Sequence, residues 1–162
     1  MPTAEFYIEQ LNLLPHPEGG YYKETYRAEK EVSVEGFEGN RNISTAIYFL
    51  LKDTEKSHLH RIKSDEIWFF HQGESVEVIV LHNNECRIHT LGKQIDRGEV
   101  YQLVVPAGAW FGARMKGAAG FALVSCTVAP GFDFTDFELA EYKKISREFP
   151  AYQTVLNEMC IE

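Results

Sequence analysis

The sequence is poor in positive charge. Its 162 residues include 16 Lys and Arg against 24 Asp and Glu, which gives a net charge of −8 at pH 7. Proteins that bind nucleic acids or membrane surfaces neutralise phosphates with clusters of Lys and Arg, and the chain has no such cluster. We therefore expect no nucleic-acid or membrane partner.

Long apolar runs and paired cysteines are also missing. No stretch approaches the length of a transmembrane helix, and the first residues, 1–5, lack the basic and apolar segments of a secretory signal. The three cysteines, Cys86, Cys126 and Cys160, form no Cys-x-x-Cys pair. This argues against a zinc ribbon or a disulfide scaffold and favours reduced thiols, so we expect a cytoplasmic protein.

Common catalytic signatures are absent. No Ser-His-Asp or Cys-His order suggests a nucleophile, and the glycines at 117 and 120 indicate a hairpin turn rather than a phosphate-binding loop. The length suits one domain, residues 1–162, with a substantial core.

Most of the chain has the pattern of short strands. Between residues 44 and 130, apolar and β-branched segments alternate with Gly, Pro and Asn, and Asn83-Asn84 is a hairpin signal. The segment 75–80 begins with an alternation that predicts one wet and one packed face. The sequence therefore predicts an all-β jelly roll or barrel, with its core at about residues 21–130.

Helices are predicted only at the two ends. Residues 3–13 have near-helical apolar spacing behind Thr3, which can cap the helix. Residues 137–149 and 151–159 predict a C-terminal helical tail, at about 137–160, interrupted by Pro150. The polar segment 31–42 is predicted to be a loop.

The most informative motif is His58-x-His60, followed by Glu66 and Gly73. Alternate residues of a strand point to the same side, so both imidazoles are expected to face one direction. Glu66 begins the next strand and can meet them inside a barrel. Two imidazoles and one carboxylate are a suitable ligand set for Mn, Fe, Ni, Cu or Zn.

This motif resembles the first cupin motif, with one extra residue between His60 and Glu66. The second cupin motif is partly present, because Pro106 and Gly108 are kept but Phe111 stands where the fourth ligand, a histidine, is expected. Further segments are similar to the small single-domain cupins called cupin-5, a family of unknown function, from about residue 9 to 142; they are 14–27, 60–68, 105–111 and 130–137. The resemblance implies a double-stranded β-helix and a homodimer.

Two interpretations of the His and Glu residues remain open. In one, His58, His60 and Glu66 bind a single divalent metal ion. In the other, His60 and Glu66 are a catalytic acid–base pair without any cofactor, because burial between aromatic residues raises the proton affinity of a carboxylate. Sugar-nucleotide epimerases on the cupin fold use a histidine base without a metal. The chain resembles these enzymes only in its expected fold, so the comparison is an analogy. The His-x-His pair favours a metal, and Phe111 disfavours one.

Aromatic and polar residues complete the candidate site. Barrel mouths that bind ligands are commonly apolar and aromatic, and the same residues can instead pack in the core. An Arg suits a carboxylate or phosphate. The loop 15–20, Pro-His-Pro-Glu-Gly-Gly, either covers the pocket with Glu18 facing a ligand or forms a turn before a strand that pairs across a dimer. The candidate ligand-binding residues are Trp68, Trp110, Phe111, Tyr48, Arg27 and Gln102.

These patterns favour a small-molecule-binding cupin. The leading hypothesis is a metal-independent isomerase or epimerase that acts on a sugar-like or carboxylated substrate. The alternatives are a ligand-binding protein without catalysis and a metal-dependent oxygenase or hydrolase. The sequence leaves open whether the protein is an enzyme.

Overall fold

The computed structural model describes residues 1–161, and the last residue of the predicted 1–162 domain lies outside them. The strands are β1 Leu14–Pro15, β2 Tyr21–Arg27, β3 Glu31–Val32, β4 Arg41–Asn42, β5 Thr45–Lys52, β6 Lys56–Arg61, β7 Asp65–Gly73, β8 Val76–His82, β9 Glu85–Leu91, β10 Gln102–Val105, β11 Trp110–Met115, β12 Phe121–Ala129 and β13 Glu138–Leu139. The α-helices are α1 Ala4–Gln10, α2 Tyr142–Glu148 and α3 Gln153–Met159, with short 3-10 turns at Ile95–Arg97, Phe134–Asp136 and Pro150–Tyr152.

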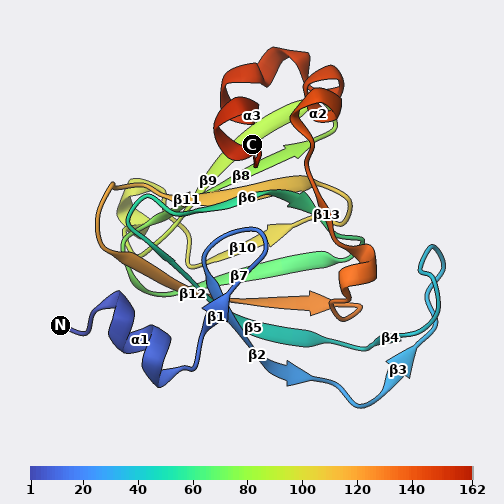
Figure 1. The fold of residues 1–162 in the computed structure, drawn as a ribbon, viewed down its shortest axis with the longest axis horizontal. Helices are drawn as coiled ribbons and strands as arrows, with labels where there is room; N and C mark the ends of the chain where they lie inside the picture. The colour runs from blue at the N-terminus through green and yellow to red at the C-terminus, as the bar shows by residue number, and fades with distance from the viewer. Residues whose placement is uncertain (162) are drawn as a thin grey trace.

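Two antiparallel sheets face each other and enclose the main core (Figure 1). One sheet has the order β1-β2-β5-β12-β7-β10, and the other has the order β13-β6-β11-β8-β9. A separate pair, β3 and β4, extends from the first sheet (Figure 1). The predicted all-β, double-stranded β-helix with a short N-terminal helix and a C-terminal helical tail is confirmed.

The strands predicted between residues 44 and 130 all form, with small shifts of their ends. The hairpin at Asn83-Asn84 is confirmed, because both residues have positive φ values of 50° and 62°. Such values are typical of the tight turn that joins two antiparallel strands, here β8 and β9.

The prediction of one wet face on β8 is wrong for most of the strand. Val78 and Val80 pack in the core between the sheets, whereas Ile79 and Leu81 pack outward in a second cluster with α2 and α3. The C-terminal helices lie against the outer face of this sheet (Figure 1). Both faces of the strand are therefore buried, because the tail supplies an apolar cover for the outer one.

The terminal helices are shorter than predicted. Thr3 caps α1 by accepting a hydrogen bond from the Phe6 amide, but the helix ends at Gln10 rather than at residue 13. Residues 138–139 form β13 rather than the start of a helix, since they pair with the open edge of β6. None of the helices within residues 1–161 has the length and apolar character that a membrane span requires.

Candidate functional site

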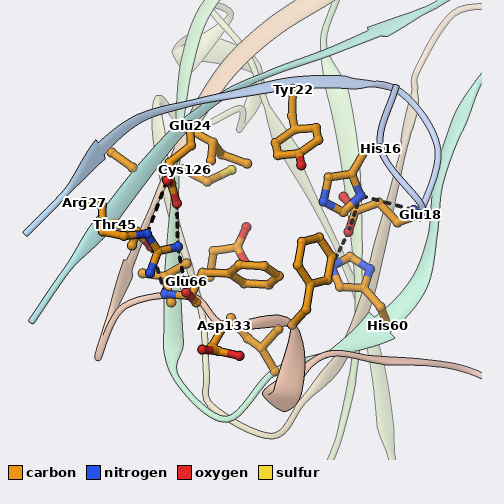
Figure 2. Close-up of a pocket in the computed structure, with 16 residues that line it drawn as sticks. His16, Glu18, Tyr22, Glu24, Arg27, Thr45, His60, Glu66, Cys126 and Asp133 are labelled. Carbon is orange, nitrogen blue, oxygen red and sulfur yellow. Dashed lines mark hydrogen bonds and ion pairs between the residues drawn. The ribbon is translucent and has the colours of Figure 1, made fainter. Parts of the chain in front are cut away.

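A cavity of about 390 Å³ lies between the two sheets, where β2, β5, β6, β7 and β12 meet the segments 16–18 and 132–134 (Figure 2). Its walls combine charged, aromatic and aliphatic side chains. They are His16, Glu18, Tyr22, Glu24, Arg27, Thr45, Ala46, Ile47, His60, Ile62, Glu66, Cys126, Val128, Phe132, Asp133 and Phe134. Of the residues predicted from the sequence, His60, Glu66, Arg27 and Glu18 line this cavity.

An irregularity in β6 decides which side chains enter the cavity. Along the neighbouring β11, Phe111 is paired with His60 and Ala113 with Ser57, so three steps on β6 match two steps on β11. This is a β-bulge, which breaks the alternation of side chains. Ser57 and His60 therefore both face Glu18. The prediction that His58 and His60 share one side is wrong for this reason.

Glu18 is held in the cavity by a tight loop. His16 N donates to the Gly20 carbonyl at 2.9 Å, and Gly19 N donates to the His16 carbonyl at 3.0 Å. The φ values of Gly19 and Gly20, 104° and 74°, suit glycine. The backbone carbonyl of Glu18 accepts hydrogen bonds from the backbone N and the ring Nδ1 of His58.

The Glu18 carboxylate forms a buried ion pair with His60. Oε2 lies 2.9 Å from His60 Nε2, and Oε1 accepts a hydrogen bond from Ser57 Oγ at 2.8 Å. Burial disfavours charge on both groups, but the charge of His60 and its hydrogen bond outweigh burial and lower the pKa of Glu18. Burial also opposes the charge on His60, and the charge and hydrogen bond of Glu18 overcome it and raise the pKa of His60.

His60 has no free ring nitrogen. Its Nδ1 lies 2.7 Å from the His58 carbonyl, to which it donates, and its Nε2 faces Glu18. The ring lies between Phe111 and Phe137, with centroid distances of 4.1 and 5.3 Å. Because a carbonyl accepts at one nitrogen and a carboxylate at the other, the arrangement stabilises the imidazolium.

Glu66 is the second buried carboxyl group of the cavity. Desolvation raises its pKa to about 7, the charge of His60 opposes this rise, and the charge of Glu18 adds to it. Burial and the neighbouring Glu66 in turn raise the pKa of the Cys126 thiol well above its usual value. The Trp68 indole faces Glu66 and slightly lowers its pKa without reaching regular hydrogen-bond geometry. Glu66 is therefore a carboxyl group that changes protonation near neutral pH.

His16 contributes a neutral imidazole. Its Nδ1 accepts a hydrogen bond from the Glu18 amide at 3.1 Å. Burial lowers its pKa, the carboxylate of Glu18 opposes this, and the charge of His60 lowers it further. His16 therefore adds no positive charge to the cavity.

Glu24 and Arg27 are exposed to solvent, and together with Asp133 they line the mouth of the cavity. Arg27 forms an ion pair with Glu24 at 2.6 Å. The segment that carries Asp133 is fastened by a buried ion pair between Arg41 and Asp136, whose atoms meet at 2.7 and 2.8 Å.

The other predicted ligand-binding residues lie outside the cavity lining. Trp68 packs in the core near Phe111, and Trp110 packs in the outer cluster beneath Arg61, whose Cζ is 4.3 Å from the ring. Within residues 1–161 neither buried indole N–H has a hydrogen-bond partner. Tyr48 packs with the cluster around α1, and Gln102 is exposed on β10.

The predicted metal ligands do not converge. His58 lines a separate shallow pocket beside Gly19 and Gly20, whereas His60 and Glu66 line the cavity. His60 Nε2 is already engaged by Glu18. Among the described residues, no group of three or more His, Cys, Asp or Glu side chains is arranged to hold a metal ion. The donor geometry does not fit the metal that the cupin motif implies.

The site also contains four residues for which the sequence suggests no specific role. His16, Tyr22, Glu24 and Asp133 all line the cavity. The signal for the first three was the segment 15–27, where prolines and glycines bring polar and aromatic residues together. Asp133 comes from a loop more than a hundred residues later, and no spacing rule connects it to them.

Comparisons with known proteins agree with this fold. A hypothetical protein from Leishmania major is 38% identical, with 99% of this chain and all of that chain covered and a TM-score of 0.93. The protein SO0799 from Shewanella oneidensis is 37% identical, with 99% of both chains covered and a TM-score of 0.90. The uncharacterized protein YML079W of Saccharomyces cerevisiae is 35% identical over 84% of this chain and 76% of its own length.

More distant similarity concerns the fold alone. Oxalate decarboxylase of Bacillus subtilis is 16% identical, with a TM-score of 0.56 over 90% of this chain and 36% of the decarboxylase. The family model described as "Cupin superfamily (DUF985)" matches residues 5–140. This match spans most of the chain, and the chain therefore belongs to the DUF985 family of the cupin superfamily.

Proposed function

We propose that the cavity is the active site of a metal-independent enzyme that moves protons on a small molecule, with Glu66 as the proton-transfer group and the His60–Glu18 ion pair as its fixed electrostatic partner. The observation that carries this proposal is the position of the Glu66 carboxyl group, which is buried, faces the cavity and lies beside that pair. Isomerases and epimerases need a carboxyl group of this kind, which takes up and releases a proton.

The chemical step follows from the protonation states. A general base works best when its pKa is near the working pH, and the pKa of Glu66 is about 7. The ionised carboxylate would take a proton from a hydroxyl-bearing carbon beside a carbonyl group of the substrate and return it to the former carbonyl carbon. The hydroxyl proton passes to the former carbonyl oxygen, so the carbonyl group moves by one carbon and no atom is gained or lost. The substrate oxygen gains negative charge in between, and the Tyr22 hydroxyl, which points into the cavity (Figure 2), can donate a hydrogen bond to it.

The role of His60 differs from the one expected from its sequence motif. Both ring nitrogens are engaged, so the imidazole has no lone pair with which to accept a proton from a substrate. We therefore assign to His60 a positioning and electrostatic role. Tyr22 is better placed to contact a substrate oxygen, because its hydroxyl group points into the cavity (Figure 2).

The positions of the candidate ligand side chains support a mechanism without a metal. The β-bulge turns His58 away from His60, and Phe111 packs against His60 in the place where the fourth ligand of the cupin motif is expected. The Glu18 carboxylate forms an ion pair with His60 instead of acting with it as a metal ligand.

Proton exchange with solvent tests the proposal. The protein is incubated in heavy water with dihydroxyacetone and, separately, with pyruvate, and loss of the substrate C–H signals is followed by NMR. We expect the protein to accelerate exchange on at least one of them and Glu66→Gln to reduce the acceleration about a hundredfold or more. Glu9→Gln, an exposed change of the same kind on α1, should retain it. No acceleration on either compound, or full activity in Glu66→Gln, would contradict the proposal.

A binding protein without catalysis is the second candidate, and the apolar part of the wall favours it. Aliphatic and aromatic groups of Ile47, Ile62, Val128, Phe132 and Phe134 line the cavity, as is common in ligand sites. In this case Phe134→Ala should lower the affinity for a ligand found by screening more than Glu66→Gln does. The reverse order would favour acid–base chemistry.

We further propose that the protein is a cytoplasmic homodimer. The three cysteines are free thiols, which is usual in a reducing compartment. The short strand β1 is an edge of the larger sheet, and its Leu14 is exposed. Exposed edges of this kind are commonly covered by a partner. Light scattering after size exclusion, with Leu14→Lys as the variant, tests the dimer.

A further inference from the structure

We propose that the cavity selects ligands that donate hydrogen bonds and carry no negative charge, such as a hydroxylated ring, and that it excludes carboxylates and phosphates. This inference rests on the proposed function in placing the substrate in the cavity, and it chooses the sugar-like substrate class over the carboxylated one. It follows from the charges on the wall, where four carboxyl side chains face two cationic ones: Glu18, Glu24, Glu66 and Asp133 against His60 and Arg27.

Arg27 has little capacity left for an anion. Its Nε and one Nη donate to the two carboxylate oxygens of Glu24, and the same Nη also donates to the Phe132 carbonyl at 3.0 Å. The other Nη donates to Asn42 Oδ1 at 2.8 Å. Four of the five N–H groups of the guanidinium are thus committed within the protein, and its charge is balanced by Glu24.

His60 is equally unavailable. Both nitrogens are engaged by the protein, and the Glu18 carboxylate compensates the charge. His16 does not replace it, because its Nδ1 accepts a hydrogen bond from the Glu18 amide, as it does in a neutral imidazole. An anionic ligand would therefore find no unpaired cation on the cavity wall.

The polar atoms that remain on the wall mainly accept hydrogen bonds, although the Tyr22 hydroxyl can also donate one. Glu66 faces the cavity, and Asp133 uses only Oδ1, which accepts from the Thr135 amide at 2.8 Å. That hydrogen bond and nearby Arg41 and Arg27 keep the pKa of Asp133 low against the effect of burial. A carboxylate or phosphate beside these groups would meet like charge in a partly desolvated space. A hydroxyl group would donate to them, and the apolar wall would contact its ring.

Two probes that share one ring separate the possibilities. Benzyl alcohol and benzoate are titrated into the protein at about pH 8, where Glu66 is ionised, and backbone amide shifts of the cavity strands β5 and β12 are followed by NMR. We expect benzyl alcohol to shift these amides and to bind at least about tenfold more tightly than benzoate. Asp133→Asn keeps the oxygen that caps Thr135 and should improve benzoate binding alone. Glu9→Gln changes the net charge equally on an exposed surface and should change neither.

Three results would overturn the inference: benzoate binding as well as the alcohol, neither probe shifting the cavity amides, or Asp133→Asn leaving the preference unaltered. The enzyme proposal is judged separately, because these titrations need no turnover. If the charge preference holds while no solvent exchange is catalysed, the cavity is a selective binding site and the acid–base proposal fails. If exchange is catalysed on pyruvate in preference to dihydroxyacetone, the proposed function stands and the ligand class is wrong.

Discussion

His60 Nε2 lies 2.9 Å from Glu18 Oε2, and both side chains are less than a tenth exposed. The two residues are 42 positions apart in the sequence, one on a bulged strand and the other on a glycine-supported loop. Their contact explains why His60 carries charge inside an apolar barrel, since a buried charge is tolerated only when it is paired.

Glu18→Gln should destabilise the protein by about 3 kcal/mol, because it leaves a buried imidazolium without its counter-ion. Because the pKa of Glu18 is lowered, its stabilisation of the folded state is fully present above pH 4.5. It is lost as the pH falls through the pKa of Glu18 in the folded protein. Because the pKa of His60 is raised, its stabilisation of the folded state is fully present below pH 6.5. It is lost as the pH rises through the pKa of His60 in the folded protein. The loss should therefore be largest between these two values.

Urea unfolding at several pH values measures this effect, and NMR should show the pKa of His60 falling below its ordinary value in the variant. Ser57→Ala is the matched control, because it removes one hydrogen bond to the same carboxylate but keeps the ion pair. It should cost about 1 kcal/mol at every pH. Equal and pH-independent losses in the two variants would show that the pair is not charged.

Glu66 should make the native protein less stable as pH rises. Its native pKa of about 7 is above the ordinary value of 4.5, so the folded state holds the proton more tightly than the unfolded state. This stabilisation is fully present below pH 4.5 and is lost as the pH rises through about 7. Relative to wild type, Glu66→Gln should gain about 3 kcal/mol between about pH 4 and pH 8. Chemical unfolding of both proteins checks this, and a constant difference would refute the raised pKa.

Elemental analysis of tag-free protein should find far less than one transition metal per chain, with no further decrease in His60→Ala. The reason is that Glu18 occupies the ring nitrogen that a metal would need, and that the bulge turns His58 away. One equivalent of metal that disappears in the variant would instead establish a metal site, and His58→Ala would then show whether the first histidine takes part.

Arg41→Lys should loosen the cavity mouth. Lys keeps the charge but cannot reproduce the two parallel contacts with Asp136. We expect faster amide hydrogen exchange in residues 131–137, which carry Phe132 and Asp133. Arg87→Lys, at an exposed ion pair on β9, should leave exchange in this segment unchanged, and a similar response to both variants would argue against the role of Arg41.

The fold was largely predictable from local patterns. Each strand between residues 44 and 130 carries its own apolar and β-branched pattern, and Asn83-Asn84 marks its hairpin without help from distant residues. The helical tail is also predictable from the sequence. Its exact start is not, because residues 138–139 become a strand only when the open edge of β6 lies beside them.

Local sequence patterns are sufficient to place His60 and Glu66 in the interior of a barrel, since both stand on recognisable strands among apolar residues. The side chains that they contact depend instead on long-range packing. A bulge, visible only in the pairing of β6 with β11, turns His58 away from the cavity and Ser57 toward Glu18. The loop that carries Glu18 and the turn that carries Asp133 reach the cavity from opposite ends of the chain, and such contacts depend on how the sheets fold together rather than on any periodicity of the residues.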